Sequence, residues 1–213
     1  MRKAGLPVAL SAGFTPRPRL SFGLALPTGA ESTAEYLDVE LARPLEREDV
    51  ATLPARLTAA LPDGVTVQAV TEREAGASSL QDAVTSVTWE LAAPVGTDVG
   101  AVAARLLAAA ELPLERVRKG QRARDDVRPQ ILDLVPAGST TLRAELSTTG
   151  RGLRPAELAA LAFPDAEPSA VRALRTHQWI EHDGTRREVI TLGDIVPATS
   201  AGPVAAPAGA AGA

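Results

Sequence analysis

The sequence contains no cysteine. This absence excludes disulfide bonds, thiolate nucleophiles and any zinc or iron–sulfur centre held by cysteines of this chain. Only two histidines are present, His177 and His182. They lie five residues apart around a predicted strand, so they should point to opposite faces and not share a metal ion. We therefore expect no metal site and no cofactor on this chain.

Aromatic residues are scarce, at 3% of the chain, and lysine occurs only at Lys3 and Lys119. The core must therefore be built mainly from leucine, valine and alanine. No apolar run approaches the length of about 18 residues that a membrane span needs. Near the start, Pro7 and Ser11 interrupt the first apolar stretch, which argues against a signal peptide. We expect a cytoplasmic protein that does not associate with membranes.

The net charge of −4 conceals three segments of opposite sign. Residues 1–30 carry a net charge of +4, residues 31–54 carry −5, and residues 116–128 carry +4 again. A globally acidic protein with two basic segments can bind phosphate groups at one face. The alternative is that these charges are only solvated surface.

The predicted elements give an α+β protein of two halves. In the first half, alternating apolar residues predict strands at 20–24, 37–41 and 65–69, with a helix over 46–61. In the second half, the same patterns predict strands at 84–94, 114–118, 127–135, 140–147 and 171–180, helices at 99–110 and from Pro155, and a hairpin to 187–192. Apart from the short strand at 114–118, the order is strand, helix, strand, strand, helix, strand. Residues 119–126 are predicted as a basic connection.

Strand, helix, strand, strand, helix, strand is the split β-α-β order of ferredoxin-like domains, whose helices cover one face of an antiparallel sheet. We therefore predict two ferredoxin-like halves, 1–75 and 84–195. The first half opens at the end of a helix, residues 1–4, and lacks its opening strand and most of its first helix, about 20 residues on typical element lengths. Either the true start lies upstream, or this half is capped in another way. Residues 197–213 contain fourteen alanine, glycine or proline residues among seventeen and no charge, which predicts a disordered tail.

The most concentrated motif is the segment 11–19. Two prolines stiffen it, Gly13 permits a tight turn, and Arg17 and Arg19 project from it. A rigid loop that presents arginine side chains suits phosphate or carboxylate binding at low entropic cost. We predict that Ser11, Gly13 and Phe14 belong to the same recognition loop. The plain alternative is a loop that joins helix to strand, with its arginines merely solvated.

These residues also carry a resemblance. The segment from Arg2 to Val8, followed by the 11–19 motif, resembles the opening motif of the DUF2344 family of radical SAM-associated bacterial proteins. The resemblance covers about residues 1–165. It continues through these segments: Leu26-Pro27-x-Gly29, Glu35-Tyr36-Leu37-Asp38-Val39 and Leu61-Pro62-x-Gly64. It is looser in Arg118-Lys119-Gly120 and Asp126-Val127-Arg128. The chain has Thr15 and Arg17 where the family usually has asparagine and histidine, so a histidine role is lost at this loop.

The resemblance implies a partnership and not a reaction. Members of the family are fused to, or encoded beside, a radical SAM domain, whose cluster needs three cysteines. Since this chain has none, the resemblance implies an accessory or substrate-presenting module that works with a radical SAM protein.

The basic segment 116–128 is the second candidate binding surface. Its predicted contact residues are Arg118, Lys119, Arg122 and Arg128, which would hold an anionic substrate or RNA. Stacking of RNA bases needs aromatic residues on an open sheet face, and the second half offers essentially Trp89. We therefore expect backbone or small-phosphate contacts rather than base-specific recognition.

Two other classes of function remain open. One is a stand-alone RNA-modifying or RNA-processing enzyme with Asp38 or Asp126 as its acid. Glu35 and Asp38 resemble an acid pair by spacing, but in a strand they would face opposite ways, so no catalytic residue is assigned. The other is a protein–protein adaptor.

Overall fold

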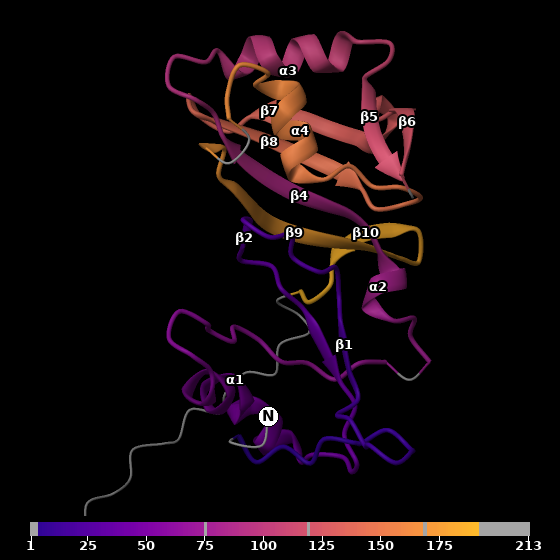
Figure 1. The fold of residues 1–213 in the computed structure, drawn as a ribbon. Coiled ribbons are helices and arrows are strands. Elements are labelled where there is room, and N and C mark those ends of the chain that lie inside the picture. Colours follow the sequence, from indigo (N-terminus) through magenta and orange to yellow (C-terminus); the bar gives the residue numbers. More distant parts are fainter. Residues whose placement is uncertain (1–3, 75, 119, 168–169, 192–213) are drawn as a thin grey trace, which may run out of the picture. The chain divides into compact units, whose positions relative to one another are not determined.

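The computed structural model describes residues 4–74, 76–118, 120–167 and 170–191 (Figure 1). Its contacts divide the chain into two compact units. The N-terminal unit takes its described residues from Met1–Arg19, Glu40–Glu74 and Ile190–Ala213, and the sheet unit consists of Leu20–Val39 and Ala75–Val189. The protein is an α+β protein, as the sequence predicts.

The sheet unit is built on one large sheet. Five of its six strands lie in the spatial order β10-β9-β4-β8-β7: β4 (Val84–Ala92), β7 (Ile131–Pro136), β8 (Thr141–Ser147), β9 (Ala173–His182) and β10 (Thr185–Glu188). The sixth, β2 (Glu31–Ser32), pairs with β9 outside this order. All neighbours in this order are antiparallel. It follows that β4 runs parallel to β7 with β8 between them, and that β8 runs parallel to β9 with β4 between them.

Two helices connect these parallel pairs and cover one face of the sheet. Helix α3 (Val99–Ala108) begins after Asp98, whose Oδ1 accepts a hydrogen bond from the Ala101 N–H at 3.0 Å, a typical N-cap. Helix α4 (Pro155–Ala162) begins with a proline, whose fixed φ suits the first helical position. Their buried residues join the inward residues of the strands in a single apolar core: Val87, Trp89, Leu91, Ala103, Leu106, Leu142, Ala144, Leu146, Leu158, Ala159 and Ala162. Among the described residues, no helix of this core lies on the opposite face of the sheet.

The predicted helices and strands of the second half are present, some with shifted bounds, and one predicted connection is wrong. The strand predicted at 127–135 begins with a 3-10 turn, Arg128–Gln130, before β7, and the last strand, predicted at 187–192, is β10 (Thr185–Glu188). Residues 119–126 were predicted as a connection, but residues Gln121–Asp126 form strand β6, which pairs antiparallel with β5 (Pro113–Arg118). Gly120 takes a φ of +80° at the turn, a conformation that glycine adopts without strain. The five polar and charged residues of the segment hid this strand, because apolar alternation is the main strand signal. The result is a two-stranded hairpin inserted between α3 and β7.

Residues 20–39 belong to the sheet unit, although the sequence places them in the predicted first half, residues 1–75. Strands β1 (Leu20–Phe22) and β3 (Leu37–Val39) pair antiparallel, and β2 (Glu31–Ser32) pairs parallel with β9. The fully buried Gln178 donates from Nε2 to the carbonyl of Ala34 at 2.6 Å. These bonds tie a segment to the sheet that lies about 140 residues further along the chain, which no local pattern indicates.

The N-terminal unit contains helix α1 (Arg47–Ala60), as predicted, with Pro54 inside it and Leu53 buried. The strand predicted at 65–69 is wrong: the described residues there form no strand. The Val67 N–H instead donates to the Thr58 hydroxyl at 2.9 Å. An alternating pattern makes a strand only where a partner strand accepts its backbone bonds, and no such partner lies beside these residues in the described part of the chain.

The predicted disordered tail, 197–213, and the helix end predicted at 1–4 lie outside the described residues, except for Ala4. Among the residues that are described, no helix has the length and apolar character that crossing a membrane requires.

Candidate functional site

The predicted recognition loop is a short hairpin in the N-terminal unit. Leu10 and Pro18 form an antiparallel bridge across its base. Ser11 closes the loop twice, because its N–H donates to the Arg17 carbonyl at 2.8 Å and its Oγ accepts from the Arg17 N–H at 3.0 Å. Gly13 has a φ of +121°, which residues with a side chain rarely adopt. Ser11 and Gly13 therefore shape the loop.

The tip of this loop exposes one ring and one cation. The Phe14 side chain is fully exposed, and Arg17 is exposed with no ion pair to another described residue. Arg19 is different, because its Nη1 lies 2.6 Å from Glu40 Oε1. Of the two arginines, Arg17 therefore has its charge available for an anion, while Arg19 is partly neutralised.

The second basic segment is largely the β5–β6 hairpin of the sheet unit. Its register pairs Glu115 with Arg124 and Val117 with Arg122, and these four residues share the outer face of the hairpin. Arg122 is 84% exposed and lies 3.9 Å from Glu115, whereas Arg124 is exposed with no ion pair to another described residue. The side chains of Arg118 and Lys119 lie outside the described residues.

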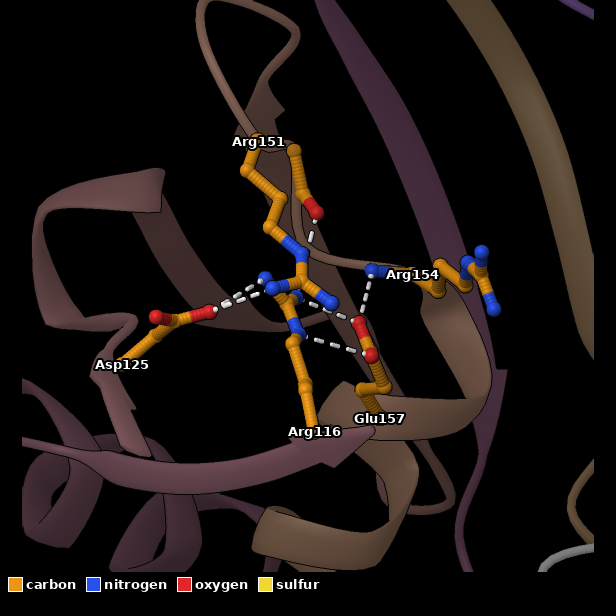
Figure 2. Close-up of polar contacts among 6 residues, drawn as sticks. Arg116, Asp125, Arg151, Arg154 and Glu157 are labelled. Carbon is orange, nitrogen blue, oxygen red and sulfur yellow. Dashed lines mark hydrogen bonds and ion pairs between the residues drawn. The ribbon is translucent and has the colours of Figure 1, made fainter. Parts of the chain in front are cut away.

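Arg116 points to the inner face of the hairpin and is 6% exposed (Figure 2). Its Nε and Nη2 lie 2.9 Å and 2.6 Å from the two carboxylate oxygens of Glu157 at the start of α4. The same guanidinium donates to the Gly152 carbonyl at 3.1 Å and lies 3.5 Å from Asp125. Hydrogen bonding to Glu157 raises the pKa of Arg116 above its ordinary value. This ion cluster fixes the hairpin to α4, so Arg116 holds the fold and does not face solvent.

Arg128 also has a structural part. Its guanidinium donates to the carbonyls of Ile131 and Leu107, both at 3.1 Å, and Leu107 lies in the last turn of α3, where carbonyls lack helical partners. Asp126 Oδ1 accepts from the N–H groups of Leu112 and Arg128 at 2.7 Å and 3.0 Å. These two backbone bonds lower the pKa of Asp126 below its ordinary value.

The carboxylate pair considered at 35 and 38 does not act as a pair. Asp38 lies in β3, whereas Glu35 precedes that strand and forms an ion pair with Arg175. Arg175 is almost fully buried, donates to the Leu24 carbonyl at 2.8 Å and lies 5.5 Å from the centroid of the Trp89 ring. Glu35 thus serves to balance a buried cation.

The two tryptophans lie on opposite faces of the sheet. Trp89 is 2% exposed and belongs to the core beneath the helices, so the expectation that it offers a stacking surface is wrong. The ring on the other face is Trp179 of β9, which is opposite Ser86 of β4. A register shift between Thr88 and Trp89 reverses which β9 residues face the helices. That irregularity could not be read from the sequence.

Three side chains form a column on this open face. The ring of His177 stacks on Trp179 with centroids 5.0 Å apart and planes 6° apart. The guanidinium carbon of Arg186 lies 3.8 Å from the centroid of the Trp179 ring, a close cation–π contact. Because Arg186 is opposite Glu181, two residues beyond Trp179, it approaches from the side away from His177. His177 Nε2 also lies 3.2 Å from Glu188 Oε1.

A groove of about 360 Å³ lies at the Arg186 end of this column. Arg186 is paired with Glu145 at 2.5 Å, and Ser86 donates to Glu145 at 2.6 Å. The lining residues come from five strands and one turn: Thr85, Ser86, Leu132, Glu145, Glu181, Gly184 and Arg186. None of these residues was among the predicted contacts, because they are distant in sequence and meet only through strand pairing.

The structure thus distributes the predicted residues over separate surfaces. Ser11, Gly13, Phe14, Arg17 and Arg19 lie in the N-terminal unit, whereas Arg122 and Arg128 lie in the sheet unit. Within the described residues there is no group of three or more histidine and carboxylate ligands that could hold a metal ion. Two of the predicted cations are exposed with charge available to an anion: Arg17 at the loop tip and Arg122 on the outer face of the hairpin.

A family model described as "Uncharacterized protein conserved in bacteria (DUF2344)" matches residues 1–155 of this chain. This range includes the recognition loop and the β5–β6 hairpin, and it ends where α4 begins. No curated protein and no solved structure gives a significant match. The column of His177, Trp179 and Arg186 lies beyond the matched range.

Proposed function

The chain belongs to the bacterial family DUF2344, and from this membership and the arginine hairpin we propose that it is a non-catalytic accessory module. In this proposal it binds an anionic substrate, most simply RNA, and presents it to a partner radical SAM protein in the cytoplasm. The absence of cysteine supports the division of labour, because the iron–sulfur cluster would belong to the partner.

The observation that carries the anion-binding part is the outer face of the β5–β6 hairpin. Arg122 and Arg124 are exposed there, and a single carboxylate, that of Glu115 at 3.9 Å, lies near Arg122. Exposed guanidinium groups bind phosphate oxygens through planar pairs of N–H donors. Val117, 70% exposed and opposite Arg122, adds an apolar surface that a purely solvated hairpin does not need.

The position of Asp126 also supports binding over catalysis. A general acid must carry a proton near neutral pH, whereas two backbone hydrogen bonds lower the pKa of Asp126. Its carboxylate is best suited to hold the chain turn between the hairpin and β7.

The strand order supports the finer fold proposal. We infer that the sheet unit is a ferredoxin-like domain, because β9-β4-β8-β7 with α3 and α4 on one face is the arrangement of two interleaved split β-α-β units. The β5–β6 hairpin and β10 would then be additions to that domain.

The anion-binding proposal is tested with a fluorescein-labelled single-stranded RNA of mixed sequence, by fluorescence anisotropy over a range of salt concentrations. Wild-type protein should bind with an affinity that falls as salt rises. Replacing Arg122 and Arg124 by alanine should reduce the slope of log K against log salt by about 1.4, at about 0.7 per lost phosphate contact. The matched control replaces two exposed arginines of the N-terminal unit, Arg43 and Arg47, and changes the net charge equally. An equal loss in both double variants would show that only overall charge matters.

The partner proposal is tested by affinity purification of the tagged protein from its native cells, with one half of the lysate treated with nuclease. Recovery of a radical SAM protein in both halves supports the accessory role. Recovery of ribosomal or RNA-bound proteins in the untreated half alone supports RNA binding and overturns the radical SAM partnership. Binding to a protein partner that is insensitive to both nuclease and salt would favour the adaptor instead.

A further inference from the structure

The groove beside Arg186 has a chemistry unlike that of the hairpin. Two carboxylates, Glu145 and Glu181, and one guanidinium, Arg186, line it together with the hydroxyl groups of Thr85 and Ser86. Its net charge is therefore −1, which does not favour a phosphate. Carboxylate and hydroxyl oxygens accept hydrogen bonds, so the groove favours a ligand rich in N–H donors.

The column of His177, Trp179 and Arg186 also limits the shape of a ligand that can bind in the groove. His177 and Arg186 cover Trp179 from its two sides, so no further group can stack on that indole ring. Arg186, however, is 49% exposed and also lines the groove. One face of its planar guanidinium lies on Trp179, and the other is available to a ligand. Its pairing with Glu145 at 2.5 Å holds this plane in position before any ligand arrives.

We propose that this groove binds an unpaired nucleobase, which stacks on the free face of the Arg186 guanidinium and donates N–H bonds to Glu181 at the rim. Stacking of bases on arginine planes is an established mode of single-strand recognition. A volume of about 360 Å³ lies at the lower end of the range for small-molecule sites, which suits one heterocycle and not a larger ligand.

The acceptors also select among the bases. Guanine carries two adjacent N–H donors on its Watson–Crick edge, which match the two oxygens of one carboxylate. Uracil carries one N–H between two carbonyl oxygens, which a carboxylate repels. We therefore expect guanine to be preferred over uracil. This inference rests on the proposed RNA binding and specifies the class of RNA, a single strand with an exposed guanine.

The experiment compares two labelled heptamers, UUUGUUU and UUUUUUU, by fluorescence anisotropy with the full chain. The guanine-containing strand should bind about tenfold more tightly, in keeping with the stacking of one base. Arg186→Lys keeps the charge but removes the planar face, and Glu181→Gln replaces one acceptor oxygen by an N–H donor. Either change should abolish the preference for guanine, and Arg186→Lys, which keeps the charge, should leave the binding of UUUUUUU unaltered. Circular dichroism checks that both variants fold.

A second arm separates a strand from a free nucleoside. Guanosine, which has no phosphate, should compete with UUUGUUU, and uridine should not. If both heptamers bind equally and Arg186→Lys has no effect, the groove proposal is overturned while the RNA-binding proposal stands. If neither RNA binds but guanosine binds to the wild type and not to Arg186→Lys, the groove proposal stands and the RNA-binding proposal is overturned. If nothing binds, both are overturned.

Discussion

Replacing Arg116 by methionine should destabilise the sheet unit much more than the loss of an exposed arginine from the same hairpin. The Arg116 guanidinium makes two hydrogen bonds to Glu157, at 2.9 Å and 2.6 Å, and one to the Gly152 carbonyl at 3.1 Å. It is 6% exposed and Glu157 is 22% exposed, so water replaces these partners poorly. Without the cation, the Glu157 carboxylate keeps only the Arg154 N–H, at 2.9 Å. We expect a loss of about 2–4 kcal/mol in the free energy of unfolding.

The measurement is urea denaturation followed by tryptophan fluorescence, which reports on the sheet unit because Trp89 and Trp179 both lie in it. Arg122→Met is the matched control and should cost less than about 0.5 kcal/mol, because that side chain is 84% exposed. The double variant Arg116→Met with Glu157→Leu should recover much of the loss, since it no longer leaves a carboxylate without its cation. If Arg116→Met costs no more than Arg122→Met, the cluster does not hold the hairpin to α4.

The other predictions concern a titrating group, the tryptophans and a buried amide. Because the pKa of Asp126 is lowered in the folded protein, its contribution to the free energy of unfolding is present above the unfolded pKa of about 3.9 and is lost as pH falls through the folded value. The difference in the free energy of unfolding between wild type and Asp126→Asn should therefore shrink below about pH 4. A difference that grows below about pH 4 would contradict this role of Asp126. Acrylamide should quench the fluorescence of Trp179 but not that of Trp89, which is 2% exposed. The variant Trp179→Phe separates the two signals, because only Trp89 then emits. Strong quenching of that remaining emission would refute the placement of Trp89 in the core. Gln178→Ala should lower the free energy of unfolding by about 1–3 kcal/mol, because it leaves the Ala34 carbonyl without its donor at 2.6 Å, and unchanged denaturation would show that residues 20–39 are held to the sheet by other contacts.

Local patterns in the sequence were sufficient for most elements of the sheet unit. The strand predicted at 84–94 and the helices predicted at 99–110 and from Pro155 correspond to β4, α3 and α4, and each is present. These signals are local, because capping and apolar spacing depend on neighbours in the chain. The absence of cysteine likewise follows from composition alone. The matched family model agrees with the motif read near residues 11–19.

Pairing between distant strands decided the rest. The sequence does not predict that Gln121–Asp126 pairs with β5, or that residues 65–69 have no partner strand among the described residues. A strand needs a partner, and the periodicity of its residues does not identify that partner. The functional surfaces depend on the same long-range choice. A register shift beside Trp89 reversed the faces of β9, so that Trp179 lies on the open face, whereas Trp89 lies in the core with Val87 and Leu91. Arg116 lies on the inner face of the hairpin and Arg122 on the outer face, because successive residues of a strand point to opposite sides. The composition determined only that many arginines would be present. The tertiary structure decided which of them balance buried carboxylates and which face solvent.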